Sequence, residues 1–269
     1  MSRTITVAGN EHVTCGDMAV TEGIANLTVS FWGKKSATAK EIFVGKWLDT
    51  TSAYFIEPFT NGKVYIGVYN SLPSNGSVAF DNDVWNHYMM VFDGNGATKA
   101  DMLKLYINGV LKTLSFNAHA MATTTGTDTA EFEIGSLLGT SRTDADIAEV
   151  KIWTASLSAG EVMSDYGGKI PRMDSLVAYW PLGQGSPEGD LSGNGNDGTL
   201  VNSPAIADHS PNMAAFGWDG EQPFAVSAAP PASTLAWARY GTYLKRRLLI
   251  LSGLFRMAFA KLIPHAPHP

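Results

Sequence analysis

Residues 146–166, DIAEVKIWTASLSAGEVMSDY, decide the fold. The segment AEVKIW alternates polar and apolar side chains with the period of two that belongs to a β-strand. A short helix is predicted directly after it, because Ser158 and Glu161 have the spacing of a capping box and Gly167 follows as a helix stop. We expect the apolar residues of this helix to cover one edge of a β-sandwich.

Similar alternating runs occupy most of the chain that precedes this stretch. They are short and are separated by clusters of Gly, Asn, Asp and Pro, which favours an all-β sandwich over a parallel sheet with crossover helices. The Asn-Gly pairs at 61–62 and 108–109 stand between strand-like runs, and this pair tolerates the positive φ angles of a tight turn. Two β-hairpins are therefore predicted at these positions.

Composition limits the classes of protein to consider. A chain of 269 residues with 45% hydrophobic residues can bury a core without cross-links. The single cysteine, Cys15, excludes an internal disulfide and is expected to be buried and inert. The N-terminal stretch has no apolar signal region, so we expect the chain to stay in the compartment where it is made.

Charge is distributed unevenly along the sequence. The net charge is −6, yet the last 48 residues contain six basic and no acidic residues, so the first 221 carry −12. An acidic body with a basic tail indicates that the tail meets something other than solvent. After the Pro/Ala-rich stretch of the tail, between residues 234 and 263, the longest uncharged run is 248–255, which is too short to span a bilayer.

Five segments occur in the order and spacing of a known family. They are LTVSFWGK (27–34), DVWNHYMMVFDG (83–94), LKLYINGVLKTLSF (103–116), FEIGS (132–136) and the stretch 146–166. Together they resemble a laminin-G-like domain of the concanavalin A-like lectin/glucanase superfamily. The resemblance implies a concanavalin A-like antiparallel β-sandwich, or jelly roll, with one short helix. It also implies that Trp32, Trp85 and Trp153 are core aromatics.

The sequence divides into three predicted parts. Residues 1–170 form the laminin-G-like sandwich, and residues 171–222 form an extension whose strands dock on it. Within the extension, LVAYWPL (176–182) and DGTLVN (197–202) are expected to pair at an edge; a remnant of a lost tandem domain is the alternative. Residues 223–269 comprise a Pro/Ala linker and a basic amphipathic helix. The helical segment, residues 235–263, is called the C-terminal arm.

Three carboxylates raise the question of catalysis. Asp144, Asp146 and Glu149 copy the spacing of the catalytic strand in glucanases of the same superfamily, although Asp144 is one methylene shorter than the expected nucleophile. In a regular strand Glu149 would also face away from Asp144 and Asp146. We therefore expect no catalytic residue, and a glycoside hydrolase that uses this trio is the alternative.

The sequence gives little indication of a metal or cofactor site. The six histidines show no zinc-binding spacing, and no nucleotide-binding loop is present. Domains of the resembled family sometimes bind calcium at the rim of the sandwich, which makes Asp49 and Asp144 candidate ligands. No cofactor is required, and the residues that would contact a ligand are not identified.

The predicted function is that of a non-enzymatic structural and adhesion protein. The resemblance extends to accessory proteins of tailed bacteriophages, which implies a virion component, for head decoration or tail association, that is made in the host cytoplasm. The arm, residues 235–263, would bind further copies of the chain or other virion proteins, and the sandwich would contact cell-surface glycans. Membrane contact by the arm is less favoured, and nucleic acid is not an expected partner. A bacterial surface adhesion module is a further alternative.

Overall fold

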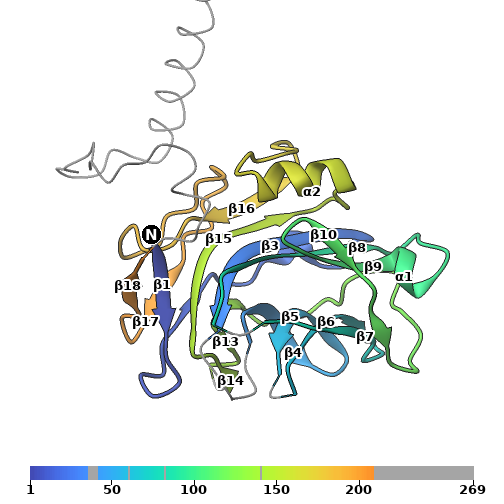
Figure 1. Cartoon of the computed structure of the whole chain (residues 1–269), viewed down its shortest axis with the longest axis horizontal. Helices are drawn as coiled ribbons and strands as arrows, with labels where there is room; N and C mark the ends of the chain where they lie inside the picture. Colours follow the sequence, from blue (N-terminus) through green and yellow to red (C-terminus); the bar gives the residue numbers. More distant parts are fainter. Residues whose placement is uncertain (36–41, 60, 82, 140, 209–269) are drawn as a thin grey trace, which may run out of the picture. The chain divides into compact units, whose positions relative to one another are not determined.

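The protein is a sandwich of two antiparallel β-sheets (Figure 1), which confirms the predicted fold class. The computed structural model describes residues 1–35, 42–59, 61–81, 83–139 and 141–208. The C-terminal arm and its linker lie outside the described residues, so the helix predicted there stays a prediction. No helix in the described part is both long and apolar enough to cross a membrane.

The first layer, sheet A, has eight strands within the described residues. Its order is β10–β9–β8–β3–β15–β1–β18, and β16 also pairs with β15. The strands are β1 (Ser2–Ile5), β3 (Asn26–Lys35), β8 (Asn86–Asp93), β9 (Leu103–Ile107), β10 (Val110–Lys112), β15 (Ala145–Trp153), β16 (Leu176–Trp180) and β18 (Ala205–Ala207).

The second layer, sheet B, also has eight strands in the described part of the chain, in the order β11–β7–β6–β5–β4–β12–β2–β17. They are β2 (His12–Thr14), β4 (Val44–Asp49), β5 (Ser52–Pro58), β6 (Lys63–Asn70), β7 (Asn75–Ala79), β11 (Ser115–Phe116), β12 (Phe132–Ile134) and β17 (Thr199–Val201). The remaining elements are a small ribbon of β13 (Ser136–Leu137) and β14 (Ser141–Arg142), the 3-10 turn η1 (Ala19–Thr21), and the helices α1 (Lys99–Met102) and α2 (Ala159–Tyr166).

Both predicted hairpins are confirmed. β5 and β6 pair across the turn that contains Gly62, and β9 and β10 pair across Asn108 and Gly109, which both have positive φ angles. The predicted helix is confirmed as α2, with the capping box between Ser158 and Glu161. One detail differs, because the left-handed residue after the helix is Gly168, with φ 79°, and Gly167 keeps a negative φ.

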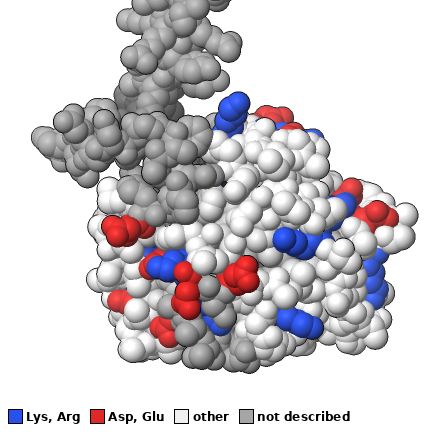
Figure 2. Space-filling model, in the orientation of Figure 1, with Lys and Arg blue, Asp and Glu red and all other residues white. Residues whose placement is uncertain are grey.

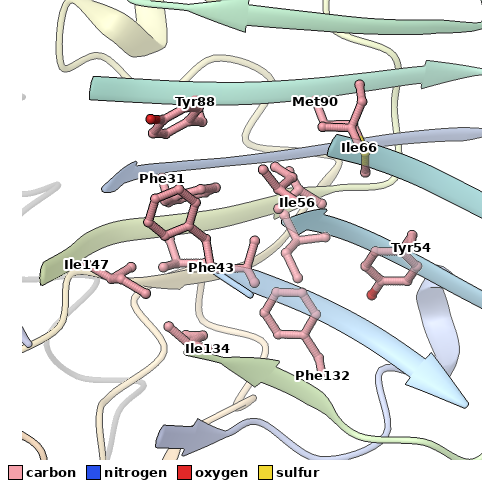
Figure 3. Packing of buried hydrophobic residues seen from close by; sticks show 14 of the residues in the cluster. Phe31, Phe43, Tyr54, Ile56, Ile66, Tyr88, Met90, Phe132, Ile134 and Ile147 are labelled. Atoms are coloured by element: carbon pink, nitrogen blue, oxygen red, sulfur yellow. The ribbon is translucent and has the colours of Figure 1, made fainter. Parts of the chain in front are cut away.

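The main core lies between the two sheets, where the inward residues of both layers interdigitate (Figure 3). Phe31 of sheet A stacks on Tyr88 at 5.3 Å between ring centroids and contacts Phe43 at 5.1 Å. Cys15 belongs to this core, which confirms the expected buried thiol, and burial raises its pKa. The alternation of in and out residues along each strand follows from the pleat of a β-sheet.

A second apolar layer covers the outer face of sheet A, where α2 packs (Figure 1). Trp153 is fully buried in this layer together with Val162 of the helix, and Trp32 stacks on Tyr166. These two tryptophans therefore lie beneath α2 instead of between the sheets. The prediction that Trp85 is a core residue is wrong, because it precedes β8 and is only half-buried.

The segment that follows α2 adds strands to both layers. β16 pairs with β15 and β18 pairs with β1 in sheet A, whereas β17 pairs with β2 in sheet B. The expected pairing between LVAYWPL and DGTLVN is therefore wrong, since the two segments contribute to opposite sheets. Each strand finds an existing sheet edge or neighbour, so no isolated pair of strands has to be stable alone.

Candidate functional site

An aromatic cluster lies on the outer face of sheet B. Along β5, Tyr54 and Ile56 point into the main core, so Phe55 between them points outward. The same alternation on β6 puts Tyr65 and Tyr69 on the outer face. We call this cluster the aromatic face; its members are Trp47, Phe55, Phe59, Tyr65 and Tyr69.

The rings of the aromatic face contact one another edge to face. Trp47 lies 5.3 Å from Phe55 and 5.4 Å from Tyr69, and the Phe55 and Tyr69 rings are 5.2 Å apart at an interplanar angle of 84°. Phe59 and Tyr65 form a separate pair at 5.2 Å. Phe55 and Tyr69 are buried beneath this layer, while Trp47, Phe59 and Tyr65 keep part of their surface in solvent. Edge-to-face packing fixes the orientation of the exposed rings.

Glycines shape the surface between the two ring groups. Phe55 stands opposite Gly45 on one neighbouring strand and Gly67 on the other. A Cβ atom at Gly67 would lie only 2.6 Å from Cε1 of Phe55, so the ring rests directly on the bare backbone of β6. Leu137 of the β13–β14 ribbon closes over Gly45 in the same way. The side chains of Phe55 and Leu137 therefore occupy the space that a larger residue at Gly45 or Gly67 would need.

Polar groups accompany the rings. Asn61 donates a hydrogen bond from Nδ2 to the Tyr65 hydroxyl at 3.0 Å, and Asn75 donates one to the Tyr69 hydroxyl at 3.1 Å. Burial raises the pKa of Tyr69, whose hydroxyl is protonated at neutral pH even without this shift and can donate a hydrogen bond. Glu57 lies directly opposite Tyr65 on the same face. The aromatic face thus combines apolar rings with hydrogen-bonding groups, the usual make-up of a small-molecule site.

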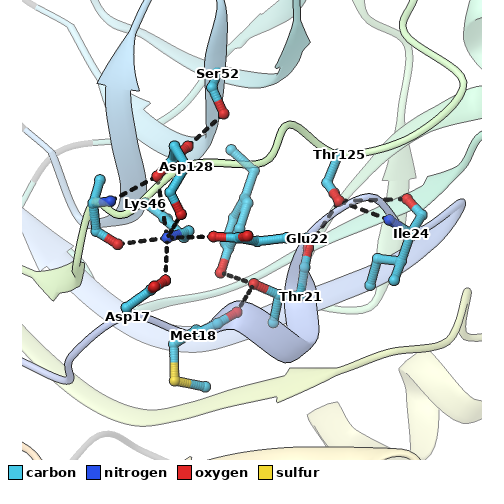
Figure 4. Close-up of polar contacts among 11 residues, drawn as sticks. Asp17, Met18, Thr21, Glu22, Ile24, Lys46, Ser52, Thr125 and Asp128 are labelled. Carbon is cyan, nitrogen blue, oxygen red and sulfur yellow. Dashed lines mark hydrogen bonds and ion pairs between the residues drawn. The ribbon is translucent and has the colours of Figure 1, made fainter.

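A buried lysine, Lys46, precedes Trp47 on β4 and points to the opposite face of sheet B. Lys46 is 1% exposed, and its Nζ atom lies 2.7 Å from Asp17, 2.9 Å from Glu22 and 3.1 Å from Asp128 (Figure 4). The Ala130 carbonyl accepts a further hydrogen bond. Burial alone would lower the pKa of Lys46, but the three carboxylates raise it, so the ammonium stays charged and fully engaged.

The first two carboxylates of the predicted trio have separate partners. Asp144 precedes β15 and accepts a hydrogen bond from the backbone N–H of Val7 at 2.8 Å. Asp146 accepts one from the Thr4 hydroxyl and lies 3.5 Å from Nζ of Lys34. Each of these side chains therefore joins β15 or its approach to a neighbouring segment.

Glu149 does not face the way the sequence predicts. It has φ 56° and stands at a β-bulge, where the register with β3 shifts between Ala148 and Lys151. Its carboxylate accepts a hydrogen bond from the Tyr179 hydroxyl and lies 3.7 Å from Nζ of Lys151. The expectation that Glu149 faces away from Asp146 is wrong, because the bulge returns it to the outer face of sheet A.

The two candidate calcium ligands are not brought together. Asp49 lies at the end of β4 in sheet B, where hydrogen bonds from the N–H and hydroxyl of Thr51 lower its pKa. Asp144 lies beside sheet A. Among the described residues, no group of three or more His, Cys, Asp or Glu side chains is arranged to bind a metal ion. Calcium at either residue therefore stays a prediction without a ligand set.

The sequence of this chain matches a known family model. The model described as "Concanavalin A-like lectin/glucanases superfamily" matches residues 7–163, more than half of the chain. The chain belongs to this superfamily. β1 and the three strands β16, β17 and β18 lie outside the matched range, yet β1, β16 and β17 pair with strands inside it, and β18 pairs with β1.

Two solved structures are similar to this chain at low sequence identity. A candidate carbohydrate-binding protein from Bacteroides ovatus is 14% identical, with a TM-score of 0.54 over 76% of this chain and 61% of that protein. The chain thus spans about three fifths of that protein's length. A pentraxin from Limulus polyphemus is 13% identical, with a TM-score of 0.45 over 60% of this chain and 78% of the pentraxin. No curated protein matches the sequence.

The superfamily resemblance did not reveal the aromatic face. Its residues lie in strands β4 to β6 and directly after β5, between the first two of the five segments that carried the resemblance. A signal was present, because Tyr65, Gly67 and Tyr69 alternate with Val64, Ile66 and Val68 along β6. Both sets are apolar enough to be core residues, so periodicity could not identify the outward set.

Proposed function

We propose that the chain is a non-enzymatic recognition module that binds glycans on the aromatic face. The observation that carries the proposal is a partly exposed group of rings, Trp47, Phe59 and Tyr65, held rigidly on the outer face of sheet B. The C–H face of a sugar ring packs on aromatic rings, and its hydroxyls bond nearby polar groups. Clusters of exposed apolar side chains on a soluble domain commonly mark a binding surface.

Substitution of Trp47 tests the proposal. Trp47→Ala removes a stacking ring, and we expect the affinity for a glycan found by array screening to fall at least tenfold, about 1.4 kcal/mol. The matched control is Trp85→Ala, which removes another half-buried tryptophan that precedes β8 of sheet A. Equal losses in both variants, or no binding of the unsubstituted chain to any glycan, would contradict the proposal.

We propose that the module is displayed on a bacteriophage virion and is held there by residues 235–263. Support comes from the family resemblance and from the +6 charge of the last 48 residues against an acidic body. Light scattering of the full chain and of a version that ends at Glu221 tests this arrangement. A large oligomer that becomes monomeric on truncation supports it, and monomers in both cases oppose it.

A further inference from the structure

Oxygen atoms from separate segments of the chain converge on the amine of Lys46 (Figure 4). Asp17 lies between β2 and η1, and Glu22 directly follows η1. Asp128 and Ala130 lie in the segment between β11 and β12. The oxygens of Asp17, Glu22 and Asp128 lie 2.7, 2.9 and 3.1 Å from Nζ. The Ala130 carbonyl accepts a hydrogen bond from the same nitrogen, and we call these four groups the oxygen cage.

Contacts other than those to the amine hold the oxygen cage in place. The Asp128 carboxylate accepts hydrogen bonds from the Ser52 hydroxyl and, at 2.8 Å, from the backbone N–H of Ala130. The backbone N–H of Glu22 donates to the first carbonyl of η1 at 3.1 Å. The Oε1 atom of Glu22 is buried and lies 2.9 Å from Nζ, but outside hydrogen-bond geometry. The fold itself therefore directs these oxygens at the position of a cation.

The oxygen cage carries more negative charge than the lysine balances. Three carboxylates, with a charge of −3, face one ammonium of +1, which leaves −2. The side chains of Asp128 and Glu22 are 2% and 10% exposed, whereas that of Asp17 is 40% exposed and brings one side of the cage to the surface. Buried carboxylates this close repel one another unless a cation lies between them. The packing of these segments therefore requires a positive charge at this point.

The groups of the oxygen cage are of the kind that a hard divalent cation prefers. Calcium binds carboxylate and carbonyl oxygens at about 2.3–2.6 Å. The three carboxylate oxygens lie further than this from Nζ, at a spacing that suits an ammonium ion. At this spacing they form no metal site in the part of the chain that the structure describes. The tip of a side chain thus fills the position that a metal ion would take after a small contraction.

We infer that the Lys46 amine is a built-in cation that joins η1, β4 and the segment before β12 in place of a calcium ion. The unsubstituted chain therefore needs no metal at this position. The same oxygens become a calcium site once the amine and its stem are removed, and the exposed side chain of Asp17 marks the side from which the ion enters. The inference does not depend on the proposed glycan binding.

Calcium titration of the full chain and of the variant Lys46→Ala tests the inference. The variant removes the amine with most of its stem, so we expect calorimetry to show one calcium ion bound per chain. We expect about 10 mM calcium to raise its thermal unfolding midpoint by about 5 °C or more, because an ion that binds only the folded state stabilises that state. Magnesium is expected to raise the midpoint less, since it demands a regular octahedral geometry.

The variant Lys46→Met is the matched control. It removes the same charge, but its unbranched side chain keeps a methyl group beside the position of the former amine and leaves no room for an ion. We expect it to be destabilised without recovery in calcium. For the unsubstituted chain, the unfolding midpoint is expected to stay the same in calcium and in a chelator.

Each outcome either supports or overturns the inference. Recovery that is confined to Lys46→Ala, and that is lost again when Asp128→Asn is added, supports it. A midpoint of Lys46→Ala that calcium does not change, or a variant that stays unfolded in calcium, overturns it. Equal stabilisation of the unsubstituted chain or of Lys46→Met also overturns it, because the ion then binds elsewhere.

Discussion

The guanidinium of Arg3 and the carboxylate of Glu188 form a buried ion pair, with 2.5 Å between Nε and Oε1, that joins the first strand to a loop 185 positions later. The other nitrogens of Arg3 donate to the carbonyls of Pro204 and Gly185. Both side chains are almost completely buried, so each charge depends on the other for its stabilisation. The pair ties the segment after α2 to the sandwich.

Removal of one partner is expected to destabilise the whole sandwich. Glu188→Ala leaves the Arg3 charge buried without a counter-ion, which costs about 3–5 kcal/mol in the free energy of unfolding. Urea unfolding, followed by tryptophan fluorescence, measures the loss. The control is Arg172→Ala, which breaks the more exposed ion pair with Glu161 and is expected to cost less than about 1 kcal/mol. Similar losses for the two variants would show that the segment around Glu188 is not integral to the fold.

Acid is expected to loosen the contact between α2 and sheet A. Asp165 of the helix is buried; desolvation opposes its charge, but Lys151, His87 and Ser30 lower its pKa from 3.8 to about 2. A pKa lowered in the folded state stabilises the protein above the ordinary value, and the stabilisation disappears as pH falls toward the folded value. The contribution of Asp165, about 2 kcal/mol, is therefore lost between about pH 4 and pH 2.

The variant Asp165→Asn measures what the charge of Asp165 contributes to stability. At pH 7 we expect it to be less stable than the unsubstituted chain, and the difference is expected to shrink as pH falls through the window given above. Urea unfolding at a series of pH values provides the comparison. A difference that stays constant down to pH 2 would mean that the Asp165 charge contributes nothing to stability.

The close approach of Phe55 to β6 predicts the effect of a single methyl group. Gly67→Ala places Cβ against a buried ring that has little room to move, and overpacking of this kind costs about 1–3 kcal/mol. Gly160→Ala is the matched control, because no atom lies within 4 Å of the added Cβ in α2 and alanine favours the helix. Thermal unfolding of both variants is expected to shift the midpoint in opposite directions.

The carboxylates on β15 are not expected to cleave glycosidic bonds. Glu149 is held by Tyr179 and Lys151, and Asp146 by Thr4 and Lys34, so we expect both to act as framework groups. The unsubstituted chain is therefore expected to release no reducing sugar from β-glucans. Release that disappears in Glu149→Gln would establish the glycoside hydrolase alternative and refute the non-enzymatic proposal.

The sequence by itself determined the local structure and the superfamily. Strand periodicity, the Asn-Gly turns and the capping box at Ser158 act over a few residues, so they can be recognised without knowledge of the fold. The charge asymmetry of the tail was likewise visible as composition. These features predicted the β-sandwich and the position of α2 correctly.

Tertiary structure alone decided which side chains meet. A shift of one residue exchanges the two faces of a strand, and both faces of β5 and β6 are apolar, so only the sheet register shows that Phe55 and Tyr65 point outward. The bulge at Glu149 reverses a side chain that regular alternation would place inside. The pair of Arg3 with Glu188 joins residues whose distance along the chain carries no information about contact in space. Local chemistry therefore fixed the elements, and long-range packing fixed the candidate site.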